Sequence, residues 1–237
     1  MTRRRWIADE VSGNRAVLSG AHADHLANVL RARVGQEFDI VAGGYVRRGK
    51  IASIEYGKIE FELGEEIPVT ATAKVVVLLS IFKFDRMEWA IEKCTELGVT
   101  RIVPLISQRT ESHLASAAAK RVERWRRIVR QASEQSRRDS APSIAAPVKL
   151  NEALAIEAET RIVLAETEHA TLLKEALNGI TGREVMLAIG PEGGWTEEEL
   201  EGFRAAGWIS ASLGNTILRA ETAAITAVAV VMSELQR

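Results

Sequence analysis

The sequence predicts an α/β protein: a small β-rich domain in the first 70 residues, then a larger domain built on a mostly parallel sheet. Two observations predict the larger domain. Residues 74–81, KVVVLLSI, form a continuous apolar run, which is typical of a strand buried on both faces. From there to the C-terminus, strand patterns alternate with helix patterns. A chain of 237 residues is long enough for two ordinary domains.

In the N-terminal part, short strands and turns predominate. Residues 38–42, the Gly43-Gly44 pair and the alternating segment from Tyr45 to Ile54 predict a β-hairpin. Residues 22–31 space their apolar side chains as a helix does. Pro68 and the small residues after it are typical of a linker. We therefore expect domains at residues 1–70 and 71–237.

In the C-terminal part, a helix is expected after the first strand, with Asp85 as its N-cap, Glu88 three residues later and Gly98 at its end. Its apolar face includes Cys94. The remaining elements follow in order. The expected strands are 101–107, 161–167, 184–190 and 208–214, and the expected helices are 117–138, 169–178, 196–206 and 221–237.

The composition narrows the class of protein. Cys94 is the single cysteine, so an internal disulfide framework and a cysteine-based zinc cluster are excluded, and no metal site is expected. A reducing, cytoplasmic setting fits this usage. The sequence has no apolar run long enough to cross a bilayer and no signal-peptide pattern, so no membrane association is expected.

The net charge of −1 hides an uneven distribution of charge. Residues 71–140 carry 14 basic and 8 acidic side chains, whereas residues 141–237 carry 7 and 14. A basic middle segment suits a polyanionic partner such as RNA. A solvated helix face explains the same pattern without any partner.

Two glycine-bearing turns stand out near the C-terminus. The first, 190–196, follows a buried strand and leads into a helix that Thr196 and Glu199 cap. Ligands of α/β sheets bind where strands end, although a plain tight turn is the alternative. The chain lacks both common phosphate-binding glycine motifs, and Glu192 with 197–199 disfavours an anionic ligand. A neutral adenosine that carries a sulfonium suits this turn better than NAD or ATP.

The second turn, 213–219, also follows a strand and leads into a mostly apolar helix. Together, IGPEGGWTEEEL at 189–200 and LGNTILRAETAAI at 213–225 resemble the 16S rRNA (uracil-N3) methyltransferase family of the SPOUT, or trefoil-knot, superfamily. Residues 22–44, 82–110 and 124–144 are similar to further stretches of that family, so the resemblance covers nearly the whole chain.

The resemblance implies a PUA-like RNA-binding β-barrel followed by a SPOUT domain with a trefoil knot. It implies S-adenosyl-L-methionine bound among the knot loops, a homodimer, and a target uridine in the decoding region of 16S rRNA on the small ribosomal subunit. Carried over by position, the cofactor-binding residues are Ile189, Gly190, Gly194, Leu213, Gly214, Ile217, Leu218 and Thr222.

Methyl transfer to uracil N3 requires that N3 first lose its proton. An arginine near the uracil oxygens would stabilise the anion, and Arg219 and Arg109 are the candidates. A structural ion pair or a phosphate contact is the alternative for each. Glu166 is the candidate general base, with a plain surface carboxylate as its alternative. Glu221 and water also remain open as bases.

RNA binding is expected to use basic side chains, because phosphate contacts supply most of the affinity. The candidates are Arg3, Arg4, Arg5, Arg124, Arg127, Arg137 and Arg138. Trp6 and Trp125 lie beside them and offer either base stacking or ordinary packing. Two other functions remain open: a SPOUT enzyme that acts on tRNA or on a ribose 2′-hydroxyl, and a non-catalytic RNA-binding assembly factor.

Overall fold

A computed structural model of the chain describes residues 5–43, 45–67, 73–136, 138, 140–180, 182 and 184–235. The chain forms two compact units, residues 1–71 with 133–141, and residues 72–132 with 142–237. Each unit is described by itself. The domain boundary expected between residues 70 and 71 lies outside the described residues.

The first unit is a curled, mixed half-barrel sheet with the strand order β1-β4-β5-β6-β3-β2. β1 pairs with β4 in parallel and all other pairs are antiparallel. Register shifts between β5 and β6 add local twist and help the sheet to curl. The strands are β1 (Arg5–Ile7), β2 (Glu10–Ser12), β3 (Arg15–Ser19), β4 (Glu37–Ala42), β5 (Tyr45–Glu55) and β6 (Lys58–Ile67).

The sequence correctly predicted the β4–β5 hairpin and the helical turn before it, which consists of α1 (Gly20–Asp24) and the π-helical η1 (His25–Val29). Leu26 from this turn is buried in the core of the unit. Gly49 faces Ile40 across the hairpin, and a β-carbon there would collide with the isoleucine side chain. The unit therefore has its own apolar core beneath the curled sheet.

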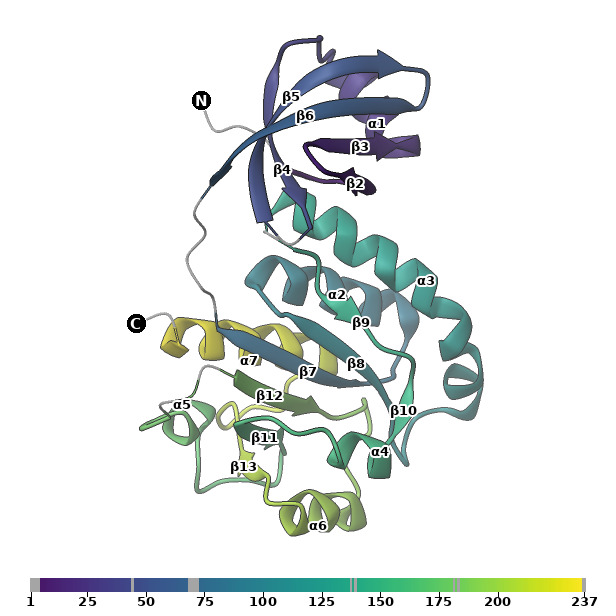
Figure 1. The fold of residues 1–237 in the computed structure, drawn as a ribbon. Coiled ribbons are helices and arrows are strands. Elements are labelled where there is room, and N and C mark those ends of the chain that lie inside the picture. The colour runs from purple at the N-terminus through teal and green to yellow at the C-terminus, as the bar shows by residue number, and fades with distance from the viewer. Residues whose placement is uncertain are drawn as a thin grey trace. The chain divides into compact units, whose positions relative to one another are not determined.

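The second unit contains a fully parallel sheet with the order β10-β8-β7-β12-β11-β13, and β9 pairs with β8 (Figure 1). Its strands are β7 (Lys74–Ser80), β8 (Arg101–Ile106), β9 (Ser143–Ile144), β10 (Val148–Lys149), β11 (Thr160–Leu164), β12 (Glu184–Ile189) and β13 (Ile209–Ala211). Its helices are α2 (Phe84–Leu97), α3 (Ser112–Gln135), which ends in the first unit, α4 (Leu150–Leu154), α5 (Leu173–Ala176), α6 (Glu197–Ala205) and α7 (Ala220–Leu235).

The central strand β7 is buried on both faces, as its apolar run predicted. Alternate side chains of a strand point to opposite faces of the sheet. Val76 and Leu78 pack in one core cluster with Ala153 of α4 and Phe203 of α6. Helix α7 contacts β7, β12 and α2. The α/β class and the parallel sheet predicted from the sequence are therefore confirmed.

Several details of the prediction were wrong. Helix α3 begins at Ser112 rather than at residue 117, and β13 covers only Ile209–Ala211 of the expected 208–214. Asp85 is not the N-cap of α2, because the helix already begins at Phe84 with Lys83 as its cap. Asp85 instead lies in the first turn, where a negative charge favours the helix dipole. The helix expected over 169–178 is only the four residues of α5. Gly98 does end α2, with a φ of 116°.

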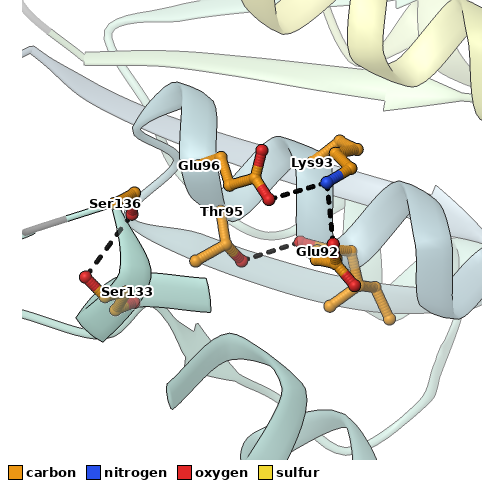
Figure 2. A network of polar contacts seen from close by, with 7 residues as sticks. Glu92, Lys93, Thr95, Glu96, Ser133 and Ser136 are labelled. Atoms are coloured by element: carbon orange, nitrogen blue, oxygen red, sulfur yellow. Dashed lines mark hydrogen bonds and ion pairs between the residues drawn. The ribbon is translucent and has the colours of Figure 1, made fainter. Parts of the chain in front are cut away.

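The exposed side of α2 carries a local ion-pair network. Lys93 Nζ lies 2.7 Å from carboxylate oxygens of both Glu92 and Glu96 (Figure 2). Cys94 is buried as predicted, and burial raises the pKa of its thiol to about 12. Among the described residues, no helix is long and apolar enough to cross a membrane.

Candidate active site

The carboxyl ends of β11, β12 and β13 lie side by side, because β11 pairs in parallel with both of the other strands. The turns that follow these strands, 165–172, 190–196 and 212–219, therefore leave the same edge of the sheet. β7 and β8 point the same way, so residues 81–83 and 107–111 leave this edge as well. This is the edge at which open α/β sheets bind ligands.

The turn 190–196 is held firmly. Gly194 has a φ of +69° and its amide donates to the Pro191 carbonyl at 2.9 Å. The Trp195 ring is buried, and its Nε1 donates to the Leu164 carbonyl at 2.8 Å. That ring meets Phe203 edge-on, with 5.0 Å between the centroids. The turn is thus tied to the end of β11 and to the core.

The predicted capping box at the start of α6 is present. Thr196 is the N-cap, and its amide donates to Glu199 Oε2 at 2.9 Å. The Glu199 carboxylate is almost fully buried, and its Oε1 also accepts a hydrogen bond from the backbone amide of Gln108 at 2.8 Å. Gln108 and the Thr196 hydroxyl are themselves 3.1 Å apart. One buried carboxylate therefore fastens the turn after β8 to the turn after β12.

Arg109 and Glu166, two of the residues predicted to act in catalysis, meet at this same turn. Arg109 Nη1 donates to the Gly193 carbonyl at 2.5 Å. Glu166 Oε1 lies 2.8 Å from the point that a β-carbon on Gly194 would occupy. A glycine is thus required at 194 for two reasons, the positive φ and the close carboxylate. The fold brings both candidates to Gly193-Gly194.

The turn 213–219 is far less constrained. Gly214 has a φ of +115°, and no atom lies within 4 Å of a β-carbon built there. The Ile217 side chain is 84% exposed. The exposed Arg219 guanidinium makes no hydrogen bond or ion pair with any described residue. Leu213 and Leu218 are half-buried, and Thr222 is exposed on the first turn of α7.

Arg86 is a site residue that the sequence reasoning missed. It lies in the first turn of α2, directly after β7, and its Nη1 donates to Glu192 Oε1 at 2.9 Å. Its Nε lies 3.9 Å from Glu221 Oε1, at the start of α7. Its position after the central strand was the one available signal. The contact itself joins residues 106 positions apart.

The basic candidates for RNA binding differ in their surroundings. Arg3, Arg4 and Arg137 lie outside the described residues. Arg124 Nε pairs with Glu88 at 2.7 Å, whereas the Arg127 side chain is exposed on α3. Arg5 and Arg138 are half-buried.

Neither tryptophan beside these arginines is available as a base platform. Trp125 is 0% and Trp6 is 5% exposed. Of the two roles left open for them, base stacking and packing, the structure supports packing.

Comparison with known proteins identifies the family. Residues 69–232 match the RNA methyltransferase domain model. Ribosomal RNA small subunit methyltransferase E of Synechocystis is 33% identical, with 92% of this chain and 73% of that protein covered. The Aquifex aeolicus protein of the same name is 30% identical, with 96% and 98% covered. The chain belongs to the ribosomal RNA small subunit methyltransferase E family.

Solved structures agree with this family. A ribosomal RNA small subunit methyltransferase E from Neisseria gonorrhoeae, bound to S-adenosylmethionine, superimposes with a TM-score of 0.84 at 30% identity. A putative methyltransferase from Legionella pneumophila, also bound to this cofactor, gives 0.85 at 28% identity. Each comparison covers 98% of both chains. The family to which the sequence segments were similar is confirmed, and so is the α/β fold with a small N-terminal β-domain and a C-terminal parallel sheet.

Proposed function

We propose that this methyltransferase transfers a methyl group from S-adenosylmethionine to N3 of a decoding-region uridine in 16S rRNA, on the small ribosomal subunit. Membership of the methyltransferase E family supports the reaction class and the rRNA substrate. The observation that carries the assignment of a reacting residue is the exposed guanidinium of Arg219 beside an open glycine turn, with no bond to any residue that the structure describes. Such an arginine is available to a substrate.

The two turns fit the proposed cofactor. The turn 213–219 offers open space at Gly214 and an exposed apolar side chain at Ile217, which suit the flat face of an adenine. The exposed carboxylate of Glu166, which lies against Gly194 of the first turn, suits a cation, whereas the Glu192 carboxylate is already paired with Arg86. When bound, the sulfonium supplies an activated methyl group. The cofactor would be held mainly by backbone groups, those of Gly190, Gly194, Leu213 and Leu218.

Arg219 would stabilise the uracil anion. Loss of the N3 proton spreads negative charge onto the two adjacent carbonyl oxygens, and a fixed cation beside them favours that state. Arg109 is the second candidate, but one of its nitrogens already binds the Gly193 carbonyl. We therefore assign Arg109 to holding the turn, with its remaining N–H groups available to the base.

Glu166 would accept the N3 proton, since its carboxylate lies against Gly194 and is exposed to an incoming uracil. N3 takes part in Watson–Crick pairing, so the target uridine must be unpaired or turned out of its stack. Arg127 and the other basic candidates would supply phosphate contacts. We also propose a homodimer, with a cytoplasmic location where the small subunits are found.

The test measures methyl transfer from radiolabelled S-adenosylmethionine to small subunits, and to 16S rRNA, from cells that lack this protein. The modified base is then mapped by reverse transcription, which an N3 methyl group stops. We expect one strong stop in the decoding region. Arg219→Ala should lower kcat by about 10²–10³-fold, as loss of a charge-stabilising donor does.

Arg204→Ala is the matched control, because Arg204 is another exposed arginine of the same unit, at the end of α6. It should leave kcat unchanged. A methyl group on tRNA or on a ribose would move the assignment to another substrate. Full activity of Arg219→Ala would remove our role for that residue, and an absence of any transfer would favour an RNA-binding factor.

A further inference from the structure

Arg86 joins the two turns of the candidate site. It reaches Glu192, in the first turn, at 2.9 Å, and Glu221, at the start of the helix that the second turn enters, at 3.9 Å. The three side chains come from separate segments, on α2, after β12 and on α7. No other described residue makes ion pairs with both of these segments.

The two carboxylates depend on Arg86 to different degrees. The Glu192 side chain is 31% exposed, so water can solvate it if the arginine is lost. The Glu221 side chain is only 7% exposed. Its Oε2 is buried and has no hydrogen-bond partner among the described residues. A buried carboxylate without a compensating charge is strongly unfavourable.

The position of Glu221 connects this charge to the reacting group. Glu221 lies in the first turn of α7, two residues after Arg219. The Arg219 carbonyl accepts the Ala223 amide at 2.8 Å, so Arg219 is part of the same helix start. A shift of Glu221 toward water would therefore move Arg219 and the end of the turn 213–219 with it.

We propose that Arg86 is a positioning residue of the methyl-transfer site, which fixes the start of α7 by compensating the buried charge of Glu221. The inference rests on the proposed function for its catalytic consequence. Its structural content, an ion bridge that orders the second turn, is independent of which substrate is methylated. Arg86 acts through Glu221 and Arg219 and need not touch the substrate.

The test replaces Arg86 with methionine, which keeps the length of the side chain and removes the charge. Lys93→Met is the matched control: Lys93 lies on the same helix, has similar exposure and, within the described part of the chain, pairs only with Glu92 and Glu96 (Figure 2). Three properties are measured: amide hydrogen exchange of the protein without cofactor, the Kd for S-adenosylhomocysteine, and kcat with KM.

Arg86→Met should speed amide exchange in residues 214–222 and raise the Kd for S-adenosylhomocysteine by roughly tenfold, a coupling typical of one ion-pair network. It should lower kcat by about a hundredfold, as a misplacement of about 1 Å does. Lys93→Met should change none of these. Arg86→Met combined with Glu221→Gln should restore most of the affinity, because the buried charge is then gone.

Arg86→Met combined with Glu192→Gln should give no such rescue, since Glu192 can be solvated. The proposal would be overturned if Glu192→Gln, and not Glu221→Gln, restored the affinity of Arg86→Met. It would also be overturned if Arg86→Met and Lys93→Met had the same exchange, Kd and kcat. An Arg86→Met protein that loses affinity for 16S rRNA and keeps its affinity for S-adenosylhomocysteine would overturn it as well. That result would make Arg86 a direct RNA contact.

If Arg86→Met is too unstable to purify, Glu221→Gln is compared with Arg86→Met/Glu221→Gln. Equal affinities support the proposal, because Arg86 then has no buried charge to compensate, and a further loss contradicts it. If the wild-type protein does not bind S-adenosylhomocysteine, the proposed function fails. The exchange comparison then still decides whether Arg86 orders the second turn.

Discussion

The two turns of the candidate site are built in opposite ways. The turn 190–196 is tied down by the Trp195 indole, by the Glu199 carboxylate and by Arg109. In the turn 213–219, Ile217 and Arg219 are exposed, and no described residue bonds the Arg219 guanidinium. The first turn is held by bonds to three neighbouring segments, whereas the second has more exposed surface. The first turn is therefore the more tightly held of the two.

Trp195→Ala should destabilise the turn 190–196 and cause the largest loss of stability. Removal of the buried indole, which packs on Phe203 and donates to the Leu164 carbonyl, would leave a cavity and an unpaired carbonyl. We expect a loss of about 3–5 kcal/mol in the free energy of unfolding. Urea denaturation followed by circular dichroism measures it. Trp89→Ala, at a site 48% exposed on α2, should cost less than about 0.5 kcal/mol.

Ile217→Ala, in the turn 213–219, should leave stability nearly unchanged and weaken ligand binding. The side chain contributes little to folding because it is 84% exposed, so the free energy of unfolding should change by less than about 0.5 kcal/mol. The Kd for S-adenosylhomocysteine should rise about fivefold, since roughly one methylene group of ligand contact is lost. Calorimetric titration measures it, with Ile209→Ala, 42% exposed on β13, as control. Unchanged binding would make the exposed side chain irrelevant to the cofactor.

The same contrast explains what the sequence could and could not predict. Thr196 with Glu199, and Gly98, are local signals, because a cap and a helix end depend on neighbours within a few residues. They appear in the structure as expected. Asp85 failed as a cap because Lys83, two positions earlier, takes that place. The alternation of strands and helices likewise predicted the parallel sheet.

Contacts between distant segments could not be predicted in this way. The Gln108–Glu199 bond and the Arg86–Glu192 pair join separate strand ends, and only the order of strands in the sheet brings them together. Nor did the basic pattern around Trp125 reveal that its ring is fully buried. The family resemblance supplied the remaining parts of the site, including the cofactor and the rRNA target, that no local pattern contains.

A third turn at the same edge, 165–172, is the subject of the prediction with the smallest expected effect, on whether a charged side chain holds a turn in place. Hydrogen bonds from the backbone amides of Ala170 and Thr171 lower the pKa of the Glu168 carboxyl below its usual 4.5. A lowered pKa means that the ionised form stabilises the fold. That contribution is present above pH 4.5 and disappears as the pH falls through the lowered pKa.

Glu168→Gln keeps the shape and removes the charge. At pH 7 we expect its Tm to lie about 2 °C below that of the wild-type protein, the size of a net contribution of roughly 1 kcal/mol or less. The gap should close as both proteins are melted at pH values that fall below 4.5 and through the lowered pKa. A gap that stays constant over this range would mean that the Glu168 charge does not order the turn. Other contacts would then hold the turn 165–172, among them the hydrogen bond that the Ala165 amide donates to the Ala211 carbonyl.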